Sequence, residues 1–170
     1  MTGPCFVDAN VLVYTLDPRD PAKQKRAAGW RDQLWLTGLG RTSAQVLSET
    51  YVTLRRLRRD EPADALWDRV ALYFAWNPHP IDEGLLRRAR EVESRFRISW
   101  WDSMIVAAAQ LQDCAVLLTE DLHDGMVFGS VTVRSPFTFE VREPAAPYGV
   151  IARAASLHPP RGRPRRTAIA

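Results

Sequence analysis

Two short apolar runs that end beside carboxylates limit the possible folds of this chain more than any other feature of its sequence. The run Cys5-Phe6-Val7 leads directly into Asp8, and a second run over residues 115–118 leads into Thr119-Glu120-Asp121. Short runs that are apolar throughout are typical of strands buried on both faces of a parallel sheet. A carboxylate at the end of such a strand lies at the edge of the core, where an unpaired charge is costly unless a cation or a partner binds it.

Helical periodicity occupies most of the remaining sequence. We expect helices over about residues 21–37, 43–58, 82–96 and 100–113, a further helix with Asp60 as its N-cap, and a last strand over residues 131–133. Strands that alternate with helices predict the α/β class, with a central parallel sheet flanked by helices in three layers. Ligands of such sheets bind at the carboxyl ends of the strands, where we expect Asp8 and Asp121 to lie.

Length and composition fit one compact domain. The chain has 170 residues, of which 46% are hydrophobic and 25% are charged. It has no apolar stretch of about 18 residues, and its start lacks the basic-then-apolar pattern of a secretory signal, so we expect a cytoplasmic protein with no membrane partner. Cys5 and Cys114 lie in apolar runs without metal-ligand spacing, which predicts buried free thiols.

The charge of the chain is unevenly distributed. All 20 Asp and Glu residues lie within residues 1–143, whereas residues 144–170 contain five arginines, five prolines and no acid. A segment with few large apolar side chains cannot bury enough surface to order itself. We therefore expect a folded domain over residues 1–142 and a basic, disordered tail over residues 143–170, which is more simply a solvated extension than an RNA-binding arm.

Two further acids lie on predicted helices. Glu49 lies at the margin of the apolar arc of its helix, and Asp102 lies in a helix that is apolar nearly all round. Each acid also has an ordinary structural explanation: Asp8 can cap a helix, Glu49 can be solvated, Asp102 can complete a capping box with Ser99, and Asp121 can shape a turn. Brought together without nearby His or Cys, four carboxylates would suit Mg²⁺ or Mn²⁺ rather than Zn²⁺.

Four segments carry these acids. They are Phe6-Val7-Asp8-Ala9-Asn10-Val11-Leu12-Val13-Tyr14, Ser48-Glu49, Ser99-Trp100-Trp101-Asp102-Ser103-Met104-Ile105-Val106-Ala107-Ala108-Ala109 and Leu117-Leu118-Thr119-Glu120-Asp121-Leu122. In their order and context they resemble the motifs of PIN domains, specifically of VapC toxin ribonucleases, over about residues 4–137. The resemblance implies site residues in three groups: catalytic acids Asp8, Glu49, Asp102 and Asp121, metal ligands Asp8, Asp102 and Asp121, and supporting residues Asn10, Ser99 and Thr119.

The resemblance also implies a function. Such a protein is the toxin of a type II toxin–antitoxin system and a divalent-metal-dependent endoribonuclease, with Mg²⁺ as cofactor and Mn²⁺ as substitute. The implied partners are substrate RNA, a VapB-type antitoxin and a second copy in a homodimer. One or two ions would neutralise the acids, bind phosphate oxygens and lower the pKa of a water. A partner surface is also suggested by large apolar side chains on the predicted helices, namely Trp30, Trp35, Leu66, Trp67 and Phe74.

Other interpretations remain open. The chain could be a PIN nuclease of RNA processing that is not a toxin, or a PIN module that binds RNA or protein without cutting, although all four acids are present. A haloacid-dehalogenase-like phosphatase also begins with an acid after a strand. That family needs a second aspartate where this chain has Asn10, and a later catalytic lysine, whereas the only lysines are Lys23 and Lys25.

Three acids follow the strand over residues 115–118, so spacing alone does not choose among Glu120, Asp121 and Asp124. The family pattern places its acid two residues after the threonine, which selects Asp121. Glu120 would then point outward, and Asp124, which precedes a glycine, would shape the turn.

Overall fold

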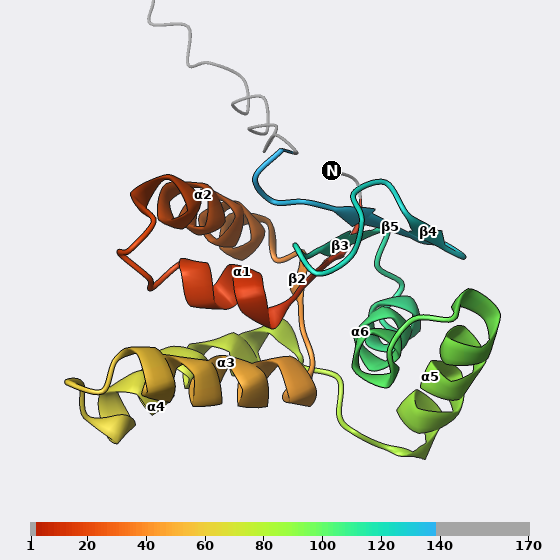
Figure 1. The fold of residues 1–170 in the computed structure, drawn as a ribbon, viewed down its shortest axis with the longest axis horizontal. Coiled ribbons are helices and arrows are strands. Elements are labelled where there is room, and N and C mark those ends of the chain that lie inside the picture. The colour runs from red at the N-terminus through yellow and green to blue at the C-terminus, as the bar shows by residue number, and fades with distance from the viewer. Residues whose placement is uncertain (1–2, 139–170) are drawn as a thin grey trace, which may run out of the picture.

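The structure, a computed structural model, describes residues 3–138 as alternating strands and helices (Figure 1). The strands are β1 (Cys5–Val7), β2 (Gly40–Arg41), β3 (Val116–Leu118), β4 (Val127–Phe128) and β5 (Val131–Arg134). The helices are α1 (Ala9–Tyr14), α2 (Pro21–Thr37), α3 (Ala44–Leu57), α4 (Ala63–Ala71), the 3₁₀ helix η1 (Leu72–Trp76), α5 (Glu83–Phe96) and α6 (Trp100–Leu111). The predicted boundary at residue 142 and the predicted basic tail lie outside the described residues.

The strands form one sheet in the order β2-β1-β3-β5-β4. β1 pairs in parallel with β2 and with β3, and β3 pairs in parallel with β5. β4 differs from the prediction, because it pairs with β5 in antiparallel orientation across a tight turn in which Gly129 takes a left-handed backbone (φ 66°). The predicted parallel sheet is confirmed, while β2 and β4, each of two residues, are too short to leave a pattern in the sequence.

The helices lie in two groups about this sheet. Figure 1 shows α1, α2, α3 and α4 together on the left of the molecule and α5 with α6 on the right. α1 packs against α2 and α3, α3 packs against α4, and α5 packs against α6, which also contacts β3 and β5. This arrangement agrees with the predicted three-layer α/β/α fold. No helix within residues 3–138 is both long enough and apolar enough to cross a membrane.

The fourth helix begins later than predicted. α4 starts at Ala63 with Pro62 as its N-cap, and Pro62 makes no side-chain capping hydrogen bond. The ring of Pro62 fixes its φ at −59°, a value suited to the start of a helix, whereas Asp60 lies in the turn that follows α3. The helix tightens into η1 and ends at Asn77, which takes a left-handed backbone (φ 50°). The other predicted helices match α2, α3, α5 and α6 to within two residues at each end.

Two of the side chains expected on the partner surface lie in the core instead. Trp30 and Leu66 are 2% and 0% exposed, so the expectation that they form part of a partner surface is wrong. The indole of Trp30 donates a hydrogen bond to the carbonyl of Pro136, at 3.1 Å, and so joins α2 to the segment after β5. Both cysteines are buried free thiols, as predicted, and burial raises the pKa of each.

Gly40 provides a test of the packing between β2 and η1. A Cβ atom at Gly40 would lie 2.5 Å from ring carbons of Trp76, closer than any relaxed contact. Because Trp76 is itself buried, we expect Gly40→Ala to lower the free energy of unfolding by about 1–3 kcal/mol. Urea unfolding followed by circular dichroism measures the change.

Gly29→Ala is the matched control. Gly29 lies within α2, and no atom comes within 4 Å of an added Cβ, so the same substitution should stabilise the protein by about 0.5–1 kcal/mol. Equal stability of Gly40→Ala and the unaltered protein would contradict the packing described here.

Candidate active site

Asp8 lies where β1 ends and α1 begins, and its carboxylate is held on both sides. It is the N-cap of α1, and its Oδ1 accepts the backbone N–H of Ala9 at 2.6 Å. Its Oδ2 accepts the hydroxyl of Thr119 at 2.7 Å. Asp8 is 6% exposed, so both oxygens are fixed in a nearly buried position. The helix-capping explanation of Asp8 is therefore correct, but it does not account for the contact with the other strand.

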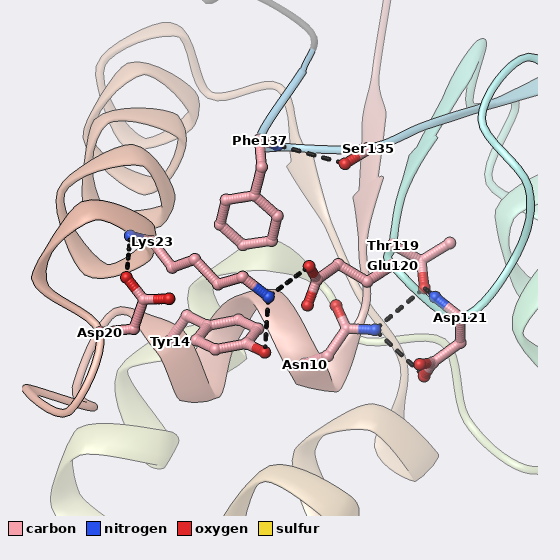
Figure 2. A network of polar contacts seen from close by, with 9 residues as sticks. All are labelled: Asn10, Tyr14, Asp20, Lys23, Thr119, Glu120, Asp121, Ser135 and Phe137. Atoms are coloured by element: carbon pink, nitrogen blue, oxygen red, sulfur yellow. Dashed lines mark hydrogen bonds and ion pairs between the residues drawn. The ribbon is translucent and has the colours of Figure 1, made fainter.

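Thr119, directly after β3, connects Asp8 with Asp121. The Thr119 hydroxyl oxygen accepts the side-chain amide of Asn10 at 3.0 Å and the backbone N–H of Asp121 at 3.0 Å. The Asn10 amide also donates to Asp121 Oδ2 at 3.1 Å (Figure 2). Asn10 Oδ1 is buried and has no hydrogen-bond partner. Asn10 and Thr119 thus hold the two aspartates next to each other.

Glu49 approaches the same site from α3. Its side chain is exposed, and its Oε1 accepts the amide of Gln45, one helical turn earlier, at 2.8 Å. Gln45 is buried, and its own Oε1 has no hydrogen-bond partner. The negative charge of Glu49 is one of the smaller causes that raise the pKa of the Asp8 carboxyl, so Glu49 lies near Asp8 although it is exposed.

Asp102 lies in the first turn of α6 and is half-buried. Ser99 is the N-cap: its Oγ accepts the backbone N–H of Asp102 at 3.1 Å and donates to Asp102 Oδ2 at 2.7 Å. Within residues 3–138 we find no contact that joins this carboxylate to Asp8, Glu49 or Asp121. The structure therefore brings three of the four predicted acids together, and the membership of Asp102 stays a prediction from its motif.

Burial and repulsion act together on Asp8. The pKa of the Asp8 carboxyl is raised from an ordinary value of 3.8 to about 6, chiefly by burial and in smaller part by the negative charges of Asp121 and Glu49. The hydrogen bonds from Thr119 and Ala9 oppose this rise without cancelling it. Ionisation of Asp8 thus lowers the stability of the folded protein, and a cation bound beside the carboxylate would offset much of that loss.

The donor chemistry of these side chains fits a divalent cation. Carboxylate oxygens are the ligands that Mg²⁺ and Mn²⁺ prefer, and the unpartnered Oδ1 of Asn10 is one more buried oxygen at the site. Among residues 3–138, no three His, Cys, Asp or Glu side chains are already arranged to hold an ion. Glu49, Asp102 and Asp121 instead turn their carboxylates toward hydrogen-bond donors beside them.

A lysine also lies at this site, and no pattern in the sequence predicts it. Lys23 on α2 forms an ion pair with Glu120 at 2.6 Å, so Glu120, although exposed, is engaged with the protein. Lysine in a helix is usually solvated, and no local pattern joins residues 97 apart. Asp124 lies in a turn, as predicted, and its Oδ1 accepts the backbone N–H of Ser135 at 2.8 Å.

The pKa of Asp8 leads to a prediction about metal-free protein. Between about pH 4 and pH 6 the carboxyl ionises in the unfolded chain but stays protonated in the fold, so its contribution to stability falls as pH rises through that window and stays lost above it. Asp8→Asn cannot ionise. We therefore expect the stability of Asp8→Asn relative to the wild type to increase by about 2–3 kcal/mol from pH 4 to pH 7.

Urea unfolding in the presence of a chelator, repeated across this pH range, measures that difference. Asp68→Asn, which removes an exposed carboxyl of α4, is the control for the loss of one acid. A difference between Asp8→Asn and the wild type that stays constant from pH 4 to pH 7 would show that Asp8 is not destabilised in the fold.

Comparison with known proteins identifies the family. The family model of the PIN domain matches residues 5–123. No match to this sequence is found among curated proteins. The fold is similar to a chain of a toxin–antitoxin complex from Klebsiella pneumoniae, with 18% identity and a TM-score of 0.55 over 81% of this chain and 99% of that chain. It is also similar to Mycobacterium tuberculosis VapC20, a toxin described as cleaving the sarcin–ricin loop, with 21% identity and a TM-score of 0.52 over 66% of this chain and 86% of that chain.

At these identities the structural similarity concerns the fold alone. The match to the PIN model is of another kind, because it runs from β1 to the loop after β3 and includes Asp8, Glu49, Asp102 and Asp121. It covers well over half of the sequence, and the resemblance noted from the motifs is confirmed. This chain belongs to the PIN domain family.

Proposed function

We propose that this protein is the toxin of a type II toxin–antitoxin system and acts as a divalent-metal-dependent endoribonuclease. The observation that carries the proposal is the environment of the Asp8 carboxylate. Asp8 is nearly buried, and burial together with the negative charges of Asp121 and Glu49 raises its pKa to about 6. An acid cluster that opposes folding in this way, at the carboxyl ends of two parallel strands, suits a site that a cation completes.

The comparisons support the same activity. The two similar solved structures are a toxin–antitoxin complex and a toxin described as cleaving the sarcin–ricin loop. Because this chain belongs to the PIN domain family, we propose that it also cleaves RNA. The phosphatase alternative gains no support, because Asn10 binds Asp121 by its amide and Lys23 is paired with Glu120.

We assign the metal ligands to Asp8, Asp102 and Asp121, with Mg²⁺ as the resident ion and Mn²⁺ as a substitute. When bound, the ion would supply positive charge for phosphate oxygens and would lower the pKa of a water. Asp8 must be ionised to act as a ligand, and the N–H of Ala9 and the hydroxyl of Thr119 favour that form. Thr119 also fixes the backbone of Asp121.

The other residues orient the site. We assign to Glu49, which is exposed on α3, the orientation of the attacking water. Asn10 holds Asp121 near Asp8, and Ser99 holds the carboxylate of Asp102. Trp101, next to Asp102, is 62% exposed and offers a ring on which an unpaired RNA base can stack. We expect the protein to meet its RNA in the cytoplasm, where free thiols persist.

Substitution of the acids tests the activity. We expect Asp8→Asn, Asp102→Asn and Asp121→Ala each to lower Mg²⁺-dependent cleavage of RNA by about 100-fold or more, since even residues that only orient metal ligands are worth about 10–100-fold. Expression of the wild type should arrest growth and expression of these variants should not. Excess Mn²⁺ should partly restore cleavage by Asp121→Ala.

Glu120→Ala and Asp124→Ala are the matched controls for the last motif. Each removes an acid within three residues of Asp121, and each should lower cleavage far less than Asp121→Ala at equal folded fraction. A folded Asp8→Asn protein that cuts RNA at the wild-type rate would show that the site assignment is wrong. A larger loss in Glu120→Ala than in Asp121→Ala would mean that the acid of this motif is one residue earlier.

We further propose that an antitoxin segment and a second copy of the chain bind the helices on the left of Figure 1. Tyr51, Trp67 and Phe74 form a chain of ring contacts there, at 5.5 Å and 6.1 Å between centroids. Trp67 and Phe74 are 45% and 52% exposed, and apolar side chains that gather on a surface mark partner sites.

Trp67→Ser tests this surface. Because a buried aromatic anchor commonly accounts for about 2 kcal/mol or more of binding, we expect Trp67→Ser to weaken binding of the protein encoded beside this one by about 30-fold or more. Calorimetry measures the affinity and light scattering the oligomeric state. Leu111→Ser, at a site on α6 with 39% exposure, is the control. A wild type that is monomeric and binds no such partner would contradict the proposal.

A further inference from the structure

Lys23 holds a position at the edge of the acid site that the proposed chemistry does not use (Figure 2). Its Nζ lies 2.6 Å from Glu120 Oε1 and 3.1 Å from the hydroxyl of Tyr14. The same atom lies 4.6 Å from the centre of the Tyr14 ring and 4.8 Å from the centre of the Phe137 ring. The ammonium group thus contacts one carboxylate and two aromatic side chains while staying partly exposed.

The groups around Lys23 are themselves fixed. Asp20 Oδ1 accepts the backbone N–H of Lys23 at 3.0 Å, which anchors the start of α2. Arg26, one turn later, donates to the carbonyl of Phe137 at 2.7 Å. The rings of Tyr14 and Phe137 meet edge to face at 5.3 Å. An ion pair between anchored partners loses less side-chain entropy on forming than one between free side chains.

This ion pair differs from most of the others in residues 3–138. Pairs on α5, such as Arg87 with Glu83, join residues three or four apart on one exposed helix, where they contribute little. Lys23 and Glu120 are 97 residues apart and join α2 to the loop after β3. The hydrogen bonds with Glu120 and Tyr14 raise the pKa of Lys23 above its ordinary value, because they favour its charged form.

The pair is one peptide bond away from a proposed metal ligand. Glu120 precedes Asp121, whose carboxylate accepts the amide of Asn10. Asn10 and Tyr14 are four residues apart on α1 and therefore lie on the same side of that helix. One face of α1 thus contacts both halves of the loop after β3: Asn10 binds Asp121 directly, and Tyr14 binds Glu120 through Lys23.

We infer that Lys23 is a positioning residue of the nuclease site: by binding Glu120 it fixes the peptide that carries Asp121, and it keeps the Glu120 carboxylate away from the metal ligands. The inference rests on the proposed function, because it assigns Lys23 a role toward the cation that Asp8 and Asp121 would bind. The expected effect of Lys23 is on the binding of the cation, and no contact between Lys23 and RNA is proposed.

The direction of the expected change in Mg²⁺ affinity distinguishes a positioning role of Lys23 from a purely electrostatic one. Lys23→Met removes a positive charge near acidic ligands, and by Coulomb attraction alone this change would tighten Mg²⁺ binding. Loss of the ion pair frees the loop and the Glu120 carboxylate, which misplaces Asp121. A weaker affinity for Mg²⁺ in Lys23→Met therefore reports on position and cannot come from the charge change.

The experiment measures Mg²⁺ affinity by calorimetry without RNA, and RNA cleavage as a function of Mg²⁺ concentration. We expect Lys23→Met to weaken Mg²⁺ binding by about 10-fold, to shift the Mg²⁺ dependence of cleavage equally, and to retain most of the rate at saturating Mg²⁺. Lys25→Met, on the same helix, exposed and with the same change of charge, should match the wild type. Lys23→Arg, which keeps the charge and the pairing, should remain near the wild type.

The most specific experiment exchanges the charges of Lys23 and Glu120. Lys23→Glu and Glu120→Lys should each weaken Mg²⁺ binding, and the double variant should recover most of the loss because the pair re-forms with reversed polarity. Mg²⁺ affinity in Lys23→Met equal to or tighter than in Lys25→Met overturns the inference. So does a raised KM for RNA at unchanged Mg²⁺ affinity, which would make Lys23 a contact for RNA phosphate.

The wild type supplies a test that needs no variant. Lys23 and Lys25 are the only lysines of the chain, so an amine-reactive label followed by peptide mass spectrometry compares them within one sample. We expect Lys23 to react several-fold more slowly, and equal reactivity overturns the inference. A wild type that binds Mg²⁺ and shows these lysine effects but cuts no RNA would refute the proposed ribonuclease while supporting the role of Lys23. A wild type that binds no Mg²⁺ overturns both.

Discussion

The parallel pairing of β1 with β3 is the contact on which the rest of the site depends. Val7 lies opposite Leu118, so the two strands end together, and the N–H of Asp8 donates to the carbonyl of Leu118 at 3.1 Å. The next residue, Thr119, can then reach Asp8 with its hydroxyl. A slip of one residue would turn every side chain of a strand to the opposite face. The apolar side chains that fix this register therefore also fix the distance between the acids.

The structural and the functional explanations of the acids are compatible. Asp8 caps α1, and Asp102 lies in a first turn capped by Ser99, as ordinary helix chemistry would have it. The hydrogen bonds at these two helix starts also orient the carboxylates. What capping does not explain is the burial of Asp8 next to the charges of Asp121 and Glu49. The surplus of negative charge, rather than the acids one by one, is what indicates a cation site.

The sequence predicted those parts of the site that depend on local pattern. Asp8 and Asp121 could be placed because apolar strands end beside them, and parallel strands present their carboxyl ends at one edge. Trp30 was misjudged because a helical aromatic is buried or exposed according to what packs against it, here the segment at Pro136. The partner of Lys23 could not be foreseen, since nothing local distinguishes it from Lys25. Contacts between distant segments, and strands of two residues, require the fold itself.

Helix α3 joins the proposed catalytic site to the proposed partner surface. Glu49 accepts the amide of Gln45 and its charge acts on Asp8, and Tyr51, two residues later, contacts the ring of Trp67. Val52, which follows Glu49 by three residues and so shares its side of the helix, is 65% exposed. An extended segment advances about 3.3 Å per residue, so a few residues suffice to pass from one region to the other. A partner on the aromatic side chains can therefore also cover Glu49, which allows inhibition by contact without any change in the fold.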